Sequence, residues 1–256
     1  MSKKTFTFYV QTCFLIVLMI SQGTTLYSQE KQLAEPTVIQ PGHKGKAPSD
    51  AILLFKKGSL NQFESIVEGS TVSSLDGSPV AWKVKGNKFT VVPGSPNIQT
   101  KDKFGDCQLH VEWKTPRKDV RDGKTSQGCG NSGIYLMGKY EVQVLNSYEN
   151  PTNPDGQAGA IYRQYPPLVN ASLQPGKWQI YDIIFTAPSF NLDGSKKSTG
   201  YFTVFHNGVL VQNHVGIKGP SQAGNEKTLI TQTELPLMLQ NHQNKVSFRN
   251  IWIRKL

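Results

Sequence analysis

The stretch GYFTVFHNGVLVQNHV, residues 200–215, decides how the rest of the chain is interpreted. Aromatic and β-branched residues fill both sides of Asn207-Gly208, which is typical of two short strands around a turn. A two-residue type I′ turn needs positive φ at both central positions, and Asn-Gly is a pair that tolerates this. The stretch therefore predicts a β-hairpin.

Similar short runs follow one another from Ala51 to the C-terminus, bounded by Gly, Asn, Asp or Pro, and no segment keeps a helical period over three turns. Many short strands with such turns predict an all-β sandwich or jelly roll of two antiparallel sheets. The runs are AILLF (51–55), AWKVKGNKFTVV (81–92), CQLHVEWK (107–114), GIYLM (133–137), YEVQVL (140–145), WQIYDIIF (178–185), LPLMLQNH (235–242) and VSFRNIWIRKL (246–256).

The N-terminus has the pattern of a secretory signal peptide over residues 1–28. Lys3 and Lys4 precede the short apolar core CFLIVLMI, and small or polar residues lead to a cleavage point near Ser28. The apolar core is shorter than the about 20 residues that a membrane-spanning helix needs. We therefore expect export to the periplasm or the medium, with no stable membrane insertion after cleavage. Residues 29–49 are polar and contain Pro and Gly, which predicts a linker or N-terminal arm before one domain at 50–256.

The net charge of +10 does not by itself indicate a nucleic-acid partner. The lysines are scattered over the chain, and no basic helix or basic patch with interleaved aromatic residues appears, so nucleic-acid binding is not expected. Cys107 and Cys129 remain after processing, and an exported protein could pair them. Because they begin successive predicted strands, the sequence leaves this disulfide open.

Two of the predicted strands each have a polar face. In residues 107–114, His110 and Glu112 alternate with apolar residues, and in residues 140–145, Glu141 and Gln143 do the same. Carboxylate, amide and imidazole groups in register suit a ligand rich in hydroxyls. A solvated surface explains the same alternation, because the pattern does not tell a ligand-binding face from any other exposed face.

Five motifs in order resemble the bacterial 3-keto-disaccharide hydrolase domain family, formerly a domain of unknown function, from about Ala51 to Leu256. The resemblance implies a concanavalin A-like jelly roll with a sugar-binding face, export, and a role in carbohydrate breakdown. It also marks departures, since the family often has an aromatic residue at Cys107 and Asp at Asn146 and Asn241. The motifs are FGDCQLHVEWKTP, GNSGIYLMGKYEVQVLNSY, GQAGAIYRQYPPLVNASLQPGKWQIYDIIFTAP, FHNGVLVQNHV and LMLQNHQNKVSFRNIWIRKL.

A 3-keto sugar has an acidic hydrogen on C2, because the ketone at C3 stabilises the resulting enolate. The resemblance therefore implies cleavage of 3-keto-glycosides or 3-keto-disaccharides by C2 deprotonation and elimination, or by net hydrolysis once water adds back. Such an enzyme needs a base near C2, a donor or cation for the enolate oxygen, and an acid for the leaving group. The alternative is a non-catalytic carbohydrate-binding module. An ordinary glycosidase is less favoured because the E-x-D-x-x-E pattern of such jelly rolls is absent.

The candidate catalytic residues are the titratable groups of these motifs: Glu141, His242, His110 and Glu112. We expect them to meet in one hollow. The candidate substrate-binding residues are amides, hydroxyls and cations nearby: Gln143, Asn131, Ser132, Tyr162, Lys114, Gln240 and Arg249, of which Lys114 or Arg249 could stabilise the enolate. Each has a structural alternative, such as turn chemistry for Asn131 and Ser132 or a salt bridge for Arg249.

The sequence leaves open whether the protein binds a divalent cation and which partner supplies its substrate. His and carboxylates on one face could hold a divalent cation that polarises the ketone, but no ligand spacing proves such a site. The substrate is a carbohydrate, and a sugar 3-oxidoreductase is a candidate upstream partner because it would produce the 3-keto group.

Overall fold

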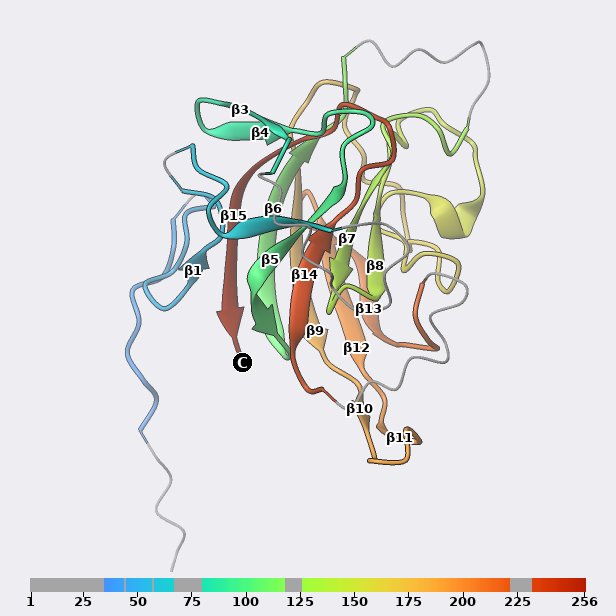
Figure 1. Cartoon of the computed structure of the whole chain (residues 1–256). Helices are drawn as coiled ribbons and strands as arrows, with labels where there is room; N and C mark the ends of the chain where they lie inside the picture. The colour runs from blue at the N-terminus through green and yellow to red at the C-terminus, as the bar shows by residue number, and fades with distance from the viewer. Residues whose placement is uncertain (1–34, 44, 57, 67–79, 118–125, 222–231) are drawn as a thin grey trace, which may run out of the picture. The chain divides into compact units, whose positions relative to one another are not determined.

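The computed structural model describes residues 35–43, 45–56, 58–66, 80–117, 126–221 and 232–256 (Figure 1). The predicted signal peptide at 1–28 lies outside the described residues. The fold below is that of the compact unit Ile39–Leu256. Among the described residues, no helix is both long and apolar enough to cross a membrane.

The larger sheet has eight strands, all paired antiparallel, in the order β13-β12-β9-β6-β15-β4-β3, with β1 also paired to β15. We call it the eight-stranded sheet. Its strands are β1 (Ile52–Leu53), β3 (Lys83–Lys85), β4 (Lys88–Thr90), β6 (Cys107–Lys114), β9 (Gln179–Thr186), β12 (Tyr201–His206), β13 (Val209–Gly216) and β15 (Ser247–Lys255).

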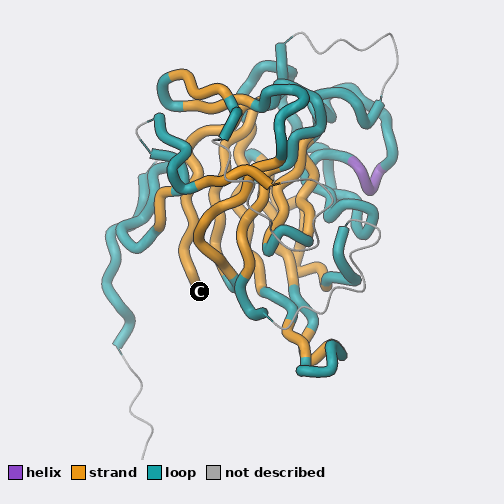
Figure 2. Tube along the Cα trace, viewed as in Figure 1, coloured by secondary structure: helices purple, strands orange, loops and turns teal. Residues whose placement is uncertain are grey.

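The second sheet has five antiparallel strands in the order β2-β5-β14-β7-β8. We call it the five-stranded sheet. Its strands are β2 (Phe63–Ile66), β5 (Asn97–Phe104), β7 (Ser132–Leu136), β8 (Tyr140–Val144) and β14 (Leu235–Leu239). A small hairpin of β10 (Ser189–Phe190) and β11 (Lys196–Ser198) and the short 3-10 helix η1 (Pro154–Gly156) complete the described elements (Figure 2).

The core lies between the two sheets and takes alternate residues from each. Leu109 and Val111 of β6 belong to the same buried cluster as Val142 and Val144 of β8. The sheets are also joined by a hydrogen bond, because the hydroxyl of buried Tyr181 on β9 donates to the carbonyl of Gln143 at 2.8 Å. The predicted all-β sandwich of two antiparallel sheets is confirmed, and the residues between these core positions face away from the core.

The hairpin predicted from residues 200–215 is present as β12 and β13. Its turn residues Asn207 and Gly208 have φ of 52° and 81°, as the type I′ turn requires. The Asn207 side chain is also used, since its Oδ1 accepts a hydrogen bond from Ile180 N at 2.9 Å. Cys107 and Cys129 are both buried and free, so they form no disulfide.

Strand β15 contains a β-bulge that later matters for a pocket. Its pairing with β6 shifts register between Arg249 and Trp252, and Asn250 has a positive φ of 46°. Phe248 and Ile251 lie in the core. The extra residue therefore lets Arg249 and Asn250, although consecutive, both point to the outer face.

Candidate functional site

The outer face of the five-stranded sheet carries one transverse row of mostly polar residues. Register places Glu64 of β2, Gln99 of β5, Met238 of β14, Tyr135 of β7 and Glu141 of β8 directly beside one another. Phe63, Ile98, Leu237, Leu239, Ile134, Val142 and Tyr140, which alternate with them, belong to the core. Four of the five residues, Gln99, Met238, Tyr135 and Glu141, are buried, and none of the four is more than 7 % exposed.

Glu141 lies at the end of this row and is only 3 % exposed. Its carboxylate leans over Gly133 of β7: an added Cβ on that glycine would lie 2.5 Å from Glu141 Oε1 and 2.5 Å from Tyr135 Cε2. The Tyr135 hydroxyl hydrogen-bonds to the carboxylate, and Gln240 Nε2 donates to that hydroxyl at 3.2 Å. The missing side chain at Gly133 thus provides the space in which the carboxylate sits.

Burial raises the pKa of Glu141 to about 7, against the opposing effects of the Tyr135 hydrogen bond and the nearby Arg163 guanidinium. Burial penalises the charged form of a carboxyl group, which is why the pKa rises. A carboxyl group with this pKa is present in both forms near neutral pH. It is therefore suited to take up a proton and to release it again.

The segment after β8 brings Tyr162 and Arg163 to this carboxylate. Tyr162 N donates to Glu141 O at 3.2 Å, so the segment follows the edge of β8. Arg163 is exposed, has a φ of 58°, and its guanidinium lies 5.4 Å from the Tyr162 ring centroid. An exposed cation beside a buried carboxylate can meet a developing oxyanion of a bound substrate.

Gln240 and His242 follow β14 at the same sheet. Gln240 N donates to Gly133 O at 3.0 Å, and its side chain reaches Tyr135, so Gln240 belongs to the Glu141 site. His242 is exposed in the loop beyond it. That loop is held to the start of β7, because Gly130 N donates to Asn244 Oδ1 at 2.9 Å.

Three predicted substrate-binding residues are committed to protein contacts. The Gln143 amide is 1 % exposed and donates to Gln127 Oε1 at 3.2 Å. Asn131 Nδ2 donates to the carbonyl of Gln127. Ser132 Oγ donates to Gln240 O at 2.6 Å from a fully buried position. These contacts support the structural alternatives for Gln143, Asn131 and Ser132, which hold the loop and the strands around Glu141.

His110 and Glu112 lie on the outer face of the eight-stranded sheet, because their neighbours Leu109 and Val111 are in the core. His110 Nδ1 lies 2.6 Å from Asp182 Oδ1, and its ring stacks on Trp252 at 5.1 Å. The arm also reaches this place: the carbonyl of Gly45 accepts hydrogen bonds from Asn250 Nδ2 at 2.8 Å and Trp252 Nε1 at 3.2 Å.

This second cluster is an ion-pair network. Burial alone would lower the pKa of His110, but hydrogen bonds to Asp182 and Glu112 outweigh it and raise that pKa to about 9. Burial would raise the pKa of Glu112, but hydrogen bonds from His110, Asn250 and Arg249 lower it to about 2. At neutral pH His110 therefore carries a proton and Glu112 does not, which suits a structural role better than proton abstraction.

Lys114 and Arg249, predicted as enolate stabilisers, lie on this same outer face. Arg249 Nε donates to Glu112 Oε2 at 2.6 Å. Both cations lie against Trp178, with Arg249 Cζ at 4.0 Å and Lys114 Nζ at 4.7 Å from the ring centroid. The cation near Glu141 is Arg163 instead.

The expected meeting of all four catalytic candidates in one hollow is not found. Glu141 and His242 belong to the five-stranded sheet and the loop after it, whereas His110 and Glu112 lie on the opposite face of the sandwich. Period-two alternation separates the two sides of one strand. It does not say which strands share a sheet, and this is why the four were grouped together.

Three residues in the row or beside Glu141 are not among the candidates predicted from the sequence: Tyr135, Arg163 and Glu64. Tyr135 lies two residues after Gly133, on the same face of β7, and it pairs directly with Glu141 on β8. Alternation predicts this contact if β7 and β8 are taken to form a hairpin. Arg163 follows Tyr162 in GAIYRQ. Glu64 accepts a hydrogen bond from Gln99 Nε2 at 2.8 Å in the same row, and its strand carries no motif that would mark it.

Within the part of the chain that the structure describes, no three His, Cys, Asp or Glu side chains are grouped so that they could hold a metal ion. The departures Asn146 and Asn241 have structural contacts there. Asn146 O accepts a hydrogen bond from Asn150 Nδ2 at 2.8 Å, and Asn241 Nδ2 donates to Val92 O at 3.0 Å.

Comparison with protein families gives a match over residues 50–254 to the 3-keto-alpha-glucoside-1,2-lyase-like domain. Among solved structures, a "putative glycosyl hydrolase" from Parabacteroides distasonis ATCC 8503 is 44% identical, with a TM-score of 0.76, over 89% of this chain and 95% of that one. Two others of the same description and organism, 17% and 20% identical, have TM-scores of 0.55 and 0.54. They cover 81% and 80% of this chain and 94% and 99% of their own, and they show a shared fold. A search of curated proteins gave no match.

Proposed function

This chain belongs to the 3-keto-alpha-glucoside-1,2-lyase-like domain family, and from that membership we propose that it cleaves 3-keto-glycosides with Glu141 as the base. The single observation that carries the proposal is the buried Glu141 carboxyl group with its pKa raised to about 7. It lies at the end of a row of hydrogen-bonding side chains on the outer face of the five-stranded sheet.

The proposed reaction begins with transfer of the C2 proton to Glu141. The electron pair of the C2–H bond enters the enolate, whose oxygen at C3 is stabilised by the Arg163 guanidinium. The C1–oxygen bond then breaks, a double bond forms between C1 and C2, and the leaving oxygen takes a proton. Protonated Glu141 can return that proton, because its pKa lies near the working pH. Addition of water across the double bond converts the elimination into net hydrolysis.

The row on the five-stranded sheet suits a polyol substrate. Gln99 and Glu64 offer an amide and a carboxylate at one end, and Tyr135 and Gln240 offer a hydroxyl and an amide beside Glu141. Tyr162, partly exposed next to Arg163, provides an aromatic ring at the edge. We further propose that the protein acts after export. The 3-keto group requires prior oxidation of a C3 hydroxyl, so a sugar 3-oxidoreductase supplies the substrate.

The test is to incubate the purified protein with p-nitrophenyl 3-keto-α-glucoside and with p-nitrophenyl α-glucoside, each with and without EDTA. We expect release of p-nitrophenol from the keto compound only, and loss of release with EDTA would establish a metal requirement. Equal turnover of both glucosides contradicts the proposal. Binding of either compound without turnover supports a non-catalytic carbohydrate-binding module.

Glu141→Gln should lower kcat on the keto compound by about 100-fold or more, the usual loss on removing a general base. The matched control is Glu234→Gln, which removes a half-exposed carboxylate paired with Lys255 at 2.9 Å and should keep the wild-type rate. Burial penalises the charged form of Glu141. Above pH about 7, the free energy of unfolding of Glu141→Gln should therefore be at least that of the wild type. Near-normal turnover in Glu141→Gln would remove Glu141 from the proposal.

A further inference from the structure

The outer face of the eight-stranded sheet carries an excess of positive charge at its β3-β4-β15-β6 end. One transverse row runs Lys83, Thr90, Ser247, Lys114, and the next runs Lys85, Lys88, Arg249, Glu112. Phe89, Phe248 and Trp113, which alternate with these residues, are in the core. Five cations and one carboxylate therefore share this part of the face, which we call the basic face.

The single carboxylate of the basic face is already neutralised. Glu112 pairs with Arg249 at 2.6 Å. Next to the basic face, Asp182 of β9 pairs with His110 of β6 at 2.6 Å. Among the described residues, the four lysines of the basic face form no ion pair. The pKa of Lys114 is lowered by burial and by repulsion from Lys88 and Arg249.

Two of the five cations, Arg249 and Lys114, pack against the same aromatic ring. The Trp178 ring lies within 4.0 Å of Arg249 Cζ and 4.7 Å of Lys114 Nζ, and cation–π attraction of this kind restrains both side chains. Like charges are costly to gather, so a packed cluster of cations with a single neutralised carboxylate is the usual arrangement of an anion-binding surface.

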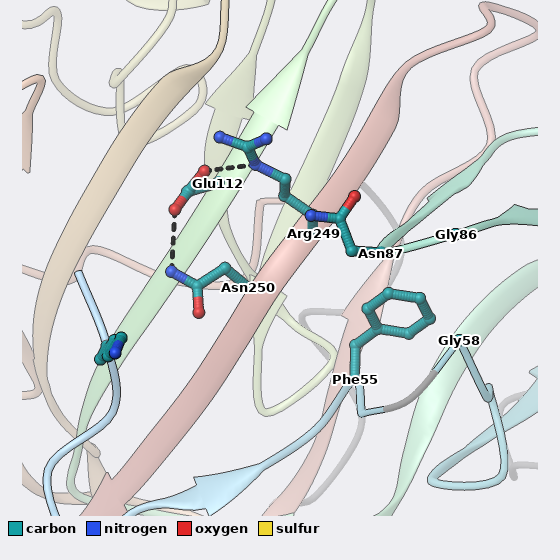
Figure 3. Close-up of a pocket in the computed structure, with 8 residues that line it drawn as sticks. Phe55, Gly58, Gly86, Asn87, Glu112, Arg249 and Asn250 are labelled. Carbon is teal, nitrogen blue, oxygen red and sulfur yellow. Dashed lines mark hydrogen bonds and ion pairs between the residues drawn. The ribbon is translucent and has the colours of Figure 1, made fainter. Parts of the chain in front are cut away.

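A pocket of about 650 Å³ borders the basic face and shares Glu112 and Arg249 with it (Figure 3). Its lining includes Glu112, Arg249 and Asn250 of the sheet, together with Phe55, Asn87 and Lys46. The bulge in β15 makes this possible, because it turns Arg249 and Asn250 to the same side. Amides, one aromatic ring and cations around a volume of this size fit a small polar ligand such as a sugar unit.

We propose that the basic face and its pocket form a second carbohydrate site, separate from Glu141, that binds a sugar unit bearing a carboxylate or sulfate group. The lysines meet the anionic group, and the Asn87 amide and the Asn250 amide oxygen meet the hydroxyls. The site lies on the opposite face of the sandwich from Glu141, so it retains an acidic glycan without taking part in the cleavage.

A nucleic acid fits this site less well than an acidic sugar. Single-strand binding relies on aromatic side chains that are free to stack on successive bases. Here Trp178 already packs against two cations, and Phe55 is buried. The pocket also has the size of one or two sugar units instead of the long groove that follows a phosphate backbone.

The test measures binding of tetragalacturonate and of a heparin tetrasaccharide by calorimetry, with cellotetraose and a short single-stranded DNA as comparisons. We expect binding of one or both acidic oligosaccharides, no binding of cellotetraose, and weakening between about 50 mM and about 200 mM salt. The double variant Lys88→Gln/Lys114→Gln should weaken binding by about tenfold or more, since it removes two of the five cations. Preference for tetragalacturonate identifies the carboxylate and preference for heparin the sulfate.

The control is Lys196→Gln/Lys197→Gln, which removes the same charge from exposed positions on β11. It should bind like the wild type. Absence of binding to both acidic oligosaccharides, equal weakening in both double variants, or equally tight binding of DNA would each overturn the proposal. Turnover of the 3-keto-glucoside by Lys88→Gln/Lys114→Gln should stay at the wild-type rate, so this proposal and the one for Glu141 fail independently.

Discussion

At the scale of single residues, the proposed chemistry depends on how the protein sets the pKa of one carboxyl group. Burial raises the pKa of Glu141, while the Tyr135 hydroxyl and the Arg163 guanidinium hold it at about 7. The sequence showed that Glu141 lies on a polar strand face. It did not show the burial or the two partners, because these come from the neighbouring strand β7 and from the segment around Arg163 that follows β8.

The pH dependence of kcat/KM should therefore show an acidic limb. The base must be ionised to take the C2 proton, so activity should fall as pH drops through about 7. Arg163→Gln removes the cation that favours the carboxylate, and should move the limb to higher pH. Arg163→Lys keeps the charge and should leave it in place. If the acidic limb of kcat/KM lies at the same pH in Arg163→Gln as in the wild type, a group other than Glu141 is being titrated.

Gly133→Ala tests the space beneath the carboxylate. The new methyl group would lie 2.5 Å from Glu141 Oε1, so the carboxylate must move, and kcat should fall by about tenfold or more, as small misplacements of reacting groups do. The matched control is Gly219→Ala, whose added Cβ meets nothing within 4 Å. Wild-type kcat in Gly133→Ala would mean that the position of Glu141 is not critical.

At the scale of secondary-structure elements, the strands were largely predictable and their partners were not. The Asn207-Gly208 hairpin and the alternation in β6 were readable from local sequence, because turn chemistry and side-chain direction are local properties. Which sheet a strand joins depends on pairings far apart in the chain, such as β15 with β6 and β14 with β7. For this reason His110 and Glu112 were predicted correctly as outward-facing but grouped with the wrong strand.

The turn between β12 and β13 allows a direct test of backbone strain. Gly208 has a φ of 81°, and an added Cβ would meet nothing within 4 Å. Gly208→Ala should therefore lower the free energy of unfolding by about 1 kcal/mol through its backbone alone.

Gly219→Ala again serves as the control, because that glycine has equal space and no positive φ. It should be neutral or slightly stabilising in denaturant unfolding. Equal destabilisation in the two variants would contradict an origin in the turn conformation.

At the scale of the whole molecule, the sandwich presents two outer faces with different chemistry. The five-stranded sheet carries a largely buried row of neutral and acidic groups that ends at Glu141, and the eight-stranded sheet carries a basic face beside an ion-pair network. The core between them separates the two, so changes on one face should not alter the other. Local alternation in the sequence does not show that the polar faces of β6 and β8 lie on opposite sides of the molecule.

The ion-pair network should make stability depend on pH on the alkaline side. The pKa of His110 is raised from 6.5 to about 9 in the folded protein. Its contribution is therefore fully present below pH about 6.5 and is lost as pH rises through about 9. The difference in free energy of unfolding between wild type and His110→Gln should shrink over this range by about 3 kcal/mol.

Denaturant unfolding at a series of pH values measures this difference, and the NMR titration of the His110 ring gives the pKa directly. A His110 ring that titrates near 6.5, with a difference in unfolding free energy that does not change with pH, would show that Asp182 and Glu112 do not hold the proton.

The most direct measurement of the central claim is the single-turnover rate of aglycon release from a 3-keto-α-glucoside carrying hydrogen or deuterium at C2. If Glu141 removes the C2 proton, the deuterated substrate should react about threefold or more slowly with the wild-type protein, and Glu141→Gln should lose release from both substrates. Equal rates for the two isotopes together with normal release by Glu141→Gln would contradict the account.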